Sequence, residues 1–335
     1  MMSDRKWLTD PDEYICTLPE DTQKIAKEEL GEDPNTRNKT IKAFRDWVVQ
    51  NPRIINCRLD SRFLLRFLRG KKFSLKHAQD SLERYLLLRQ TYGVLFSSLD
   101  MTIPMMEDLL QLGFGFACPK RDRKGRRVIV ARPGVFDIYK FTNADMVRYT
   151  GIVCETLMED EENQIRGFVY FADGNGVGLQ YLTLFTPKEA VRLVKNGEKT
   201  VPMRHKEVHG IGVHPSMKFV LDFGFSLISE KIKKRVKLYS NINELITSGN
   251  FDPEILPQEY GGKMPMAEMI ALWRKELEES HQRLLKHDEM EVREELFSPK
   301  AREGAISALK KNGTCGSEED PLCGVMGNFR KLEID

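Results

Sequence analysis

The first third of the chain places apolar residues at the spacing of amphipathic helices. The pattern predicts helices over 33–50 and 60–69 and a third that begins after Ser74, each with a period of about 3.6 residues. We expect Asn35 to be the N-cap of the first helix, because short polar side chains are favoured there. Together the three helices predict a small helical domain that packs on the rest of the chain.

From about residue 105 the pattern changes to short apolar runs that alternate with helical stripes. The sequence GFVYFA over 167–172 is apolar throughout, as expected of a strand buried on both faces of a sheet. Strands are predicted over 127–131, 167–172, 206–213 and 236–239, and helices over 143–159, 186–196 and 266–285. This alternation is typical of a mixed α/β domain with a sheet covered by helices. Residues 289–335 are polar, and we expect most of them to be loosely held or to wrap the surface.

Residues 215–237 combine a strongly apolar stretch with a run of positive charge. Apolar side chains dominate 219–228, and five Lys and Arg residues follow between 231 and 237. We interpret the segment as one helical region of about 23 residues whose cations share a face through their i, i+3 and i, i+4 spacings. Two interpretations stay open: a helix that meets a lipid surface, or a buried helix whose basic end complements the helix dipole.

Composition narrows the possible functions. The chain has 335 residues with 41% hydrophobic and 30% charged side chains, which is ordinary for a folded domain protein. It has no uninterrupted apolar run long enough to span a bilayer and begins with a polar segment rather than a signal peptide, so we expect a cytoplasmic protein. A net charge of +2 excludes bulk electrostatic binding of nucleic acid, so any anion site must come from local clustering.

The sequence offers little support for catalysis or metal binding. The glycine-rich segment 174–178 lacks the spacing of a nucleotide-binding loop and is interpreted as a turn. His205 and His209 would share one face of an extended segment with His214 on the other, a poor arrangement for a metal. The six cysteines are scattered without a CxxC pair, and no GxSxG motif occurs. We therefore expect no enzymatic activity, no metal and no cofactor.

Four sequence motifs in order resemble one family. The stretches FLLRFLRGKKF, GFVYFAD, LISEKIKKRV and ILPQEYGG are together similar to the CRAL-TRIO (Sec14-like) lipid-transfer family, in the branch of alpha-tocopherol transfer protein, cellular retinaldehyde-binding protein and the clavesins. The closing FRKLEID is similar to the tails of insect members. The resemblance implies an extension over 1–19, a helical N-terminal domain over 20–100, a lipid-binding domain over 105–265, and a C-terminal helix and loosely ordered tail over 266–335.

The resemblance also implies site residues. A sheet would floor a closed apolar cavity, and the helix over about 215–228 would be its mobile lid. The family's phosphoinositide cleft falls on Lys71, Arg204, Lys231 and Arg235. The cavity positions are Val147, Thr150, Cys154, Phe168 and Phe185, with Val220, Phe223 and Ile228 on the lid. The alternative for each cavity position is plain core packing. Lys72, Lys206 and Lys234 could supplement the cleft, but we expect each of them to belong to a solvated charged face.

These implications lead to one leading function and one alternative. The leading function is a cytosolic carrier that binds one hydrophobic small lipid, similar to a tocopherol or a retinoid, and exchanges it at phosphoinositide-containing membranes. The alternative is an endosomal trafficking adaptor of the clavesin type, with partners bound through the C-terminal tail. Either protein would be cytoplasmic and reversibly bound to endosomal or plasma membranes.

Overall fold

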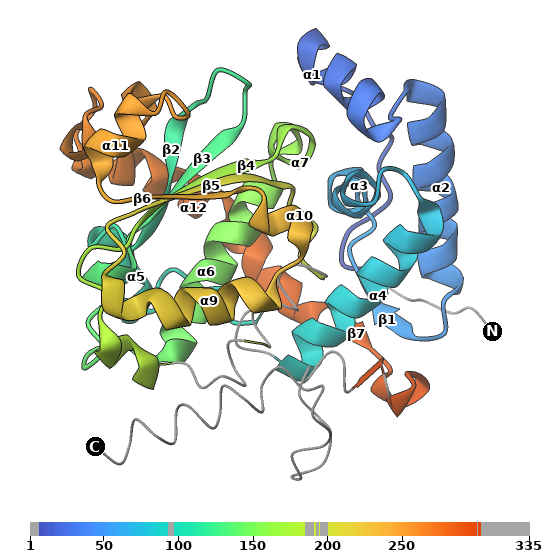
Figure 1. Ribbon diagram of the computed structural model, residues 1–335. Helices are drawn as coiled ribbons and strands as arrows, with labels where there is room; N and C mark the ends of the chain where they lie inside the picture. Colours follow the sequence, from blue (N-terminus) through green and yellow to red (C-terminus); the bar gives the residue numbers. More distant parts are fainter. Residues whose placement is uncertain are drawn as a thin grey trace.

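A computed structural model describes residues 7–92, 97–184, 191, 194, 200–299 and 301–302. Its centre is a mixed sheet in the order β2-β3-β4-β5-β6, in which β2 is antiparallel to β3 and the other pairs are parallel (Figure 1). The strands are β2 (Gly115–Arg121), β3 (Arg127–Ala131), β4 (Phe168–Asp173), β5 (His205–Ile211) and β6 (Val236–Tyr239). The predicted α/β fold class is confirmed.

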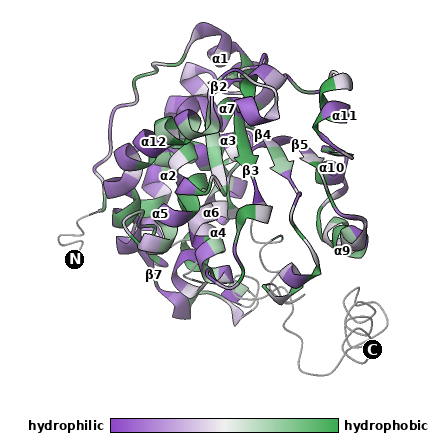
Figure 2. Cartoon of the chain, turned by 90° about the vertical axis from the view of Figure 1, so that its left-hand side faces the viewer, coloured by the Kyte–Doolittle hydropathy of each residue, from purple (hydrophilic) through white to green (hydrophobic). Residues whose placement is uncertain are grey.

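Helices surround this sheet, and a separate group of helices forms the N-terminal region. The N-terminal group is α1 (Glu20–Ile25), a π-helical turn (Ala26–Leu30), α2 (Pro34–Gln50), α3 (Ser61–Gly70) and α4 (Leu75–Tyr92). The helices around the sheet are α5 (Pro104–Gln111), α6 (Asn143–Met158), α7 (Glu161–Arg166), α9 (Lys218–Leu227), α10 (Glu230–Lys233), α11 (Ile242–Thr247) and α12 (Met266–Lys286). Figures 1 and 2 show α9 and α12 on opposite sides of the molecule. None of the helices in the described part of the chain is both long and apolar enough to cross a membrane.

A two-stranded sheet ties the end of the described chain back to the N-terminal region. Strand β1 (Ile54–Asn56) pairs antiparallel with β7 (Glu291–Val292). Met290, Val292 and Phe297 are buried in the core of the helical region. The first part of the segment expected to be loosely held thus packs on α2 to α4, while 303–335 lie outside the described residues.

Strand β2 is absent from the sequence-based expectation for a physical reason. Its sequence GFACPKR contains Pro119, which cannot donate a ladder hydrogen bond and argues against a central strand. In the structure β2 is an edge strand, and its register with β3 shifts between Ala117 and Arg121. An edge position tolerates the proline.

Two local predictions about helices are wrong. The N-cap of α2 is Asp33 rather than Asn35: Asp33 Oδ1 accepts from the backbone N–H of Asn35 and of Thr36, with Pro34 at the first helical position. The single helical region over 215–237 is broken, because Ile228 adopts an extended conformation between α9 and α10. The chain then joins the sheet through β6, as the strand prediction for 236–239 required.

The cationic end of α3 is largely buried. Arg66 and Arg69 are at most 1% exposed and bind carboxylates, although the sequence places them in one basic run with Lys71. Arg69 pairs with Glu32 of the N-terminal region at 2.8 Å. The predicted helix over 186–196 falls almost entirely outside the described residues, and the predicted domain boundaries stay a prediction.

Candidate functional site

Helix α9 is strongly apolar, yet none of its residues is fully buried. Its sequence KFVLDFGFSL holds three phenylalanines, and Phe219 is 38% exposed. Among the predicted lid residues, Val220 and Phe223 on α9 and Ile228 just beyond it are half-buried. An apolar helix of this kind normally lies in a core, and its incomplete burial is typical of an element that meets an apolar ligand or surface.

A cluster of cations lies where α3, α4 and α10 approach one another. Lys71 is the half-buried C-cap residue of α3, and burial lowers the pKa of its amine. The positive charges of Arg84 on α4 and Lys231 on α10 lower the pKa of Lys71 further. Among the described residues neither Lys71 nor Lys231 has a carboxylate partner. Like charges held together in this way favour binding of an anion.

The backbone after α3 holds Lys71 in place through an unusual turn. Lys72 and Phe73 both adopt left-handed conformations, with φ of 50° and 55°. The N–H of Phe73 donates to the carbonyl of Leu68 at 2.7 Å, which closes the end of the helix. Each left-handed residue other than glycine costs about 1–2 kcal/mol. Other interactions of the fold therefore offset this cost. The turn directs Lys71 and Lys72 away from the end of α3.

A second basic group lies at the start of β5. Arg204 Nη2 and Lys206 Nζ both donate to Oε2 of Glu29, at 2.5 Å and 2.8 Å. Burial lowers the pKa of Lys206. The positive charges of Arg204 and Arg235 also lower this pKa, whereas the carboxylate of Glu29 raises it. Arg204 and Lys206 therefore share one carboxylate, and Arg235 lies close enough to add its charge. A methyl group on Gly70 would lie 3.3 Å from Cβ of Pro202, so this group borders the end of α3.

The expectation that Lys231 and Arg235 share a helical face is wrong. Helix α10 ends at Lys233, so Arg235 lies in the connection to β6. Arg235 Nη1 donates to the carbonyl of His205. The structure thus divides the four predicted phosphoinositide residues between two adjoining groups: Lys71 with Lys231, and Arg204 with Arg235.

The predicted cavity residues occupy different environments. Phe168 is fully buried on β4, Cys154 on α6 is a half-buried free thiol, and Phe185 lies outside the described residues. Val147 is buried in the core of the helical N-terminal region, which favours core packing at this position. Thr150 is exposed, and its hydroxyl donates to the carbonyl of Met146 at 2.8 Å. The lone pairs of that hydroxyl are left for a further donor.

A polar pair on the sheet was not predicted. Tyr170 shares one face of β4 with Phe168, and its hydroxyl lies 2.7 Å from Nδ1 of His205. Burial raises the pKa of Tyr170, and a charge on Cys154 would act in the same direction, so the thiol of α6 lies near this pair. Because side chains two positions apart on a strand share a face, the cavity prediction for Phe168 could have been extended to Tyr170 from the sequence. No local pattern identifies Arg84 or Glu29, whose roles depend on tertiary packing.

The three histidines do not form a metal site. The register of β5 shifts so that Phe168 pairs with His205 and Val169 with Glu207, which places His205 and His209 on opposite faces of the sheet. The expectation that these two histidines share a face is therefore wrong. His209 is fully buried, with Nε2 3.2 Å from Glu207. The described residues contain no group of three or more side chains that could hold a metal ion.

Comparison with known proteins identifies related chains. The CRAL/TRIO domain model matches residues 113–262, and the model described as Pinta-like, UBA domain matches residues 33–106. A protein of Mus musculus named alpha-tocopherol transfer protein-like is 34% identical over 254 residues, covering 76% of this chain and 73% of its own. Human clavesin-2 is 30% identical over 260 residues, covering 75% of this chain and 77% of its own.

A solved structure titled "Crystal structure of Sfh5" aligns with 79% of this chain and all of its own at 12% identity, with a TM-score of 0.44. That likeness is too distant to carry the assignment. The identity and coverage of the two curated relatives are sufficient, and with the matched domain they lead to one conclusion. The chain belongs to the CRAL/TRIO family of lipid-transfer proteins.

Proposed function

We propose that this protein is a carrier that binds one hydrophobic small lipid and exchanges it at phosphoinositide-containing membranes. The observation that carries the proposal is the incomplete burial of α9 beside the cation cluster of Lys71, Arg84 and Lys231. Apolar surface and concentrated positive charge are the two features that bring a protein to an anionic bilayer.

The phosphate-binding part of the proposal rests on charges that the fold leaves without partners. Lys71 and Lys231 come from two elements and have no carboxylate among the described residues. The group of Arg204, Lys206 and Arg235 adds positive charge that Glu29 offsets only in part. A phosphomonoester would complete both groups through charge-assisted hydrogen bonds.

The lipid-binding part of the proposal rests on the apolar side chains of α9 and of the sheet. Among the described residues that we assign to the ligand, the polar groups are the Tyr170 and His205 pair, the Cys154 thiol and the Thr150 hydroxyl. These suit a long apolar molecule with one hydroxyl or carbonyl, in the class of tocopherols and retinoids, better than a charged two-chain phospholipid. Burying about 400 Å² of such a ligand contributes roughly 10 kcal/mol before ordering costs.

Native mass spectrometry of the purified protein, followed by organic extraction, tests the carrier function. We expect a stoichiometric apolar small molecule on the folded chain. The protein should release this molecule faster to vesicles that contain phosphatidylinositol bisphosphate than to neutral vesicles. Failure of the protein to hold any small lipid, before and after incubation with tocopherol or retinaldehyde, would contradict the proposal.

The similarity to clavesin-2 supports one alternative, a phosphoinositide-binding trafficking adaptor. An adaptor would bind the same membranes without speeding net movement of lipid between donor and acceptor vesicles. Equal transfer rates with and without the protein, despite tight vesicle binding, would favour the adaptor over the carrier.

A further inference from the structure

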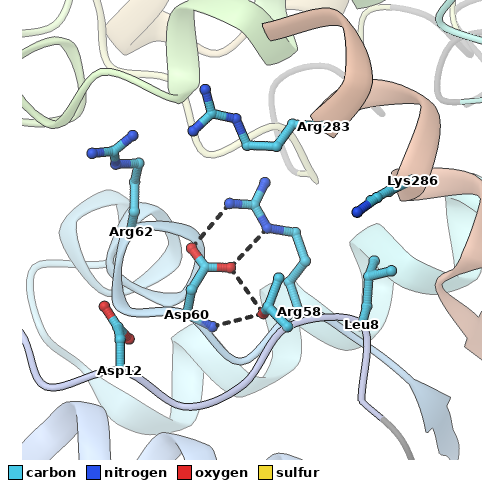
Figure 3. A pocket seen from close by; sticks show the side chains of 8 residues that line it. Leu8, Asp12, Arg58, Asp60, Arg62, Arg283 and Lys286 are labelled. Atoms are coloured by element: carbon cyan, nitrogen blue, oxygen red, sulfur yellow. Dashed lines mark hydrogen bonds and ion pairs between the residues drawn. The ribbon is translucent and has the colours of Figure 1, made fainter.

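A second basic pocket lies on the side of the molecule opposite α9. It is a cavity of about 310 Å³ between the N-terminal segment, the start of α3 and the end of α12 (Figure 3). Its lining residues are Leu8, Thr9, Asp12, Arg58, Asp60, Arg62, Arg283 and Lys286. In Figure 3, Arg283 and Lys286 extend from α12 toward the same space that Arg58 faces from the opposite wall. The size lies at the lower end of the range for small-molecule sites.

The carboxylates in the wall are already neutralised. Arg58 binds Asp60 through two hydrogen bonds, Nε to Oδ2 at 2.8 Å and Nη2 to Oδ1 at 2.9 Å. Asp12 pairs with Arg45 and accepts the backbone N–H of Ser61 at 2.7 Å. Neither acid is therefore available to balance the remaining cations of the pocket.

Two cations without a carboxylate partner and one loosely paired cation lie at the rim. Within the described part of the chain, Arg62 and Lys286 have no carboxylate partner and both are exposed. Arg283 approaches Glu159 only at 3.7 Å, beyond a good hydrogen bond. Glu159 itself is committed to Arg58 at 2.6 Å and to Arg66 at 2.7 Å. The excess positive charge therefore faces solvent in a concave site, which is the arrangement that concentrates anions.

The pocket walls are held in place before any ligand binds. The Thr9 hydroxyl donates to Asp60 Oδ2 at 3.1 Å and accepts the N–H of Leu59 at 2.8 Å. The N–H of Leu8 donates to the carbonyl of Cys57 at 3.3 Å. The N-terminal segment is thus fixed against the start of α3. Binding of a ligand would therefore cost little entropy for ordering the site.

We propose that this pocket binds a phosphate-bearing anion that is dissolved in water rather than anchored in a bilayer. The cations fit phosphate through charge-assisted hydrogen bonds, which guanidinium groups make in pairs. An adjoining pocket shares Arg62 and Arg283 but is otherwise rich in acids, including Glu276 and Glu279, so the anion is confined to the end near Lys286. Because α9 and α12 lie on opposite sides, a membrane held by α9 would leave this pocket facing water (Figure 2).

The test measures binding of inositol trisphosphate by calorimetry in a background of Lys71→Ala with Lys231→Ala. That background removes the phosphoinositide site of the proposed function, so the two proposals can fail separately. We expect binding to persist there and to weaken by at least about tenfold when Arg62→Ala and Lys286→Ala are added, since two contacts to phosphate are lost. Lys275→Ala, at another exposed position of α12, is the control and should leave the affinity unchanged.

A vesicle arm separates the two sources of phosphate. Arg62→Ala with Lys286→Ala alone should leave binding to vesicles of phosphatidylcholine and phosphatidylinositol bisphosphate at the wild-type level. Reduced vesicle binding in this variant would mean that the pocket takes a lipid headgroup, which overturns the proposal of a soluble ligand. Loss of all inositol trisphosphate binding in the Lys71 and Lys231 background would show that the pocket binds no phosphate.

Discussion

Arg66 on α3 donates through Nη1 to Oε2 of Glu155 on α6 at 2.7 Å, with both side chains buried. This ion pair joins the helical N-terminal region to the helix that covers the sheet. Arg66 Nη2 also donates to Glu159 at 2.7 Å, and the hydroxyl of Tyr85 donates to the other oxygen of Glu155 at 2.8 Å. Glu155 on α6 and Glu159 at its C-cap are thus both bound by residues of the N-terminal helical region.

Arg66→Ala should therefore destabilise the whole protein. Removing one partner of a buried pair leaves the other charge uncompensated, at a cost of about 3–5 kcal/mol. We expect a lower midpoint of urea unfolding, measured by circular dichroism. The matched control is Lys76→Ala, which removes the exposed pair of Lys76 and Asp80 and should leave the midpoint unchanged. Equal midpoints for the two variants would show that the buried pair does not hold the regions together.

The buried arginines explain why part of the fold was readable from the sequence and part was not. Apolar periodicity predicts α2, α3 and α6, because a helix that buries one face carries apolar residues at that spacing. The same periodicity cannot distinguish Arg66, which pairs inside the protein, from Lys71, which has no carboxylate partner in the part of the chain that the structure describes. Their difference depends on Glu155 and Glu159, about 90 positions further along the chain.

The candidate site shows the same division between local and distant information. The apolar segment over 219–228 is visible in the sequence, since its hydrophobicity exceeds what a one-sided helix needs. Its break at Ile228 is not visible, because the requirement that β6 pair with β5 decides where the helix ends. The bulge that separates His205 from His209 likewise arises from pairing with β4. The binding roles of the predicted site residues stay predictions.

Lys71→Glu with Lys231→Glu should abolish binding to vesicles that contain phosphatidylinositol bisphosphate. The substitutions replace two cations that already repel each other, so we expect folding to be unaffected while the phosphate loses its partners. Co-sedimentation at moderate salt measures the binding, which should also weaken in the wild-type protein as salt rises. Lys42→Glu on the exposed side of α2 changes the charge without touching the cluster and serves as the control. Undiminished co-sedimentation of the double variant would disprove the assignment.

Phe223→Asp should slow transfer of a fluorescent apolar lipid between vesicles. The side chain of Phe223 is half-buried on α9, where an unpaired charge leaves water at a high cost whether it faces ligand or membrane. Ser226→Asp introduces the same charge at an exposed position of the same helix and should have the smaller effect. If both variants transfer lipid at the wild-type rate, α9 is not the lid.

His287 should make the protein sensitive to mild acid. Its Nε2 lies 2.9 Å from Nη1 of Arg58, which can only donate, so the ring accepts there and is neutral. Burial lowers the pKa of His287 well below its usual 6.5, and nearby arginines, Arg89 first among them, act in the same direction. The unfolded chain therefore binds a proton below pH 6.5 that the folded chain does not, and the free energy of unfolding falls as the pH falls.

The size of this effect follows from the proton that only the unfolded chain takes up. At about pH 5 the free energy of unfolding is lower by up to about 2 kcal/mol. This loss disappears at pH values above the pKa that His287 has in the unfolded chain. His287→Gln keeps an acceptor for Arg58 but cannot be protonated, so its unfolding midpoint in urea should change less between pH 6.5 and pH 5 than that of the wild type. His77→Gln, at an exposed position of α4, should retain the wild-type dependence. A wild-type profile in the His287 variant would mean that other groups cause the acid sensitivity.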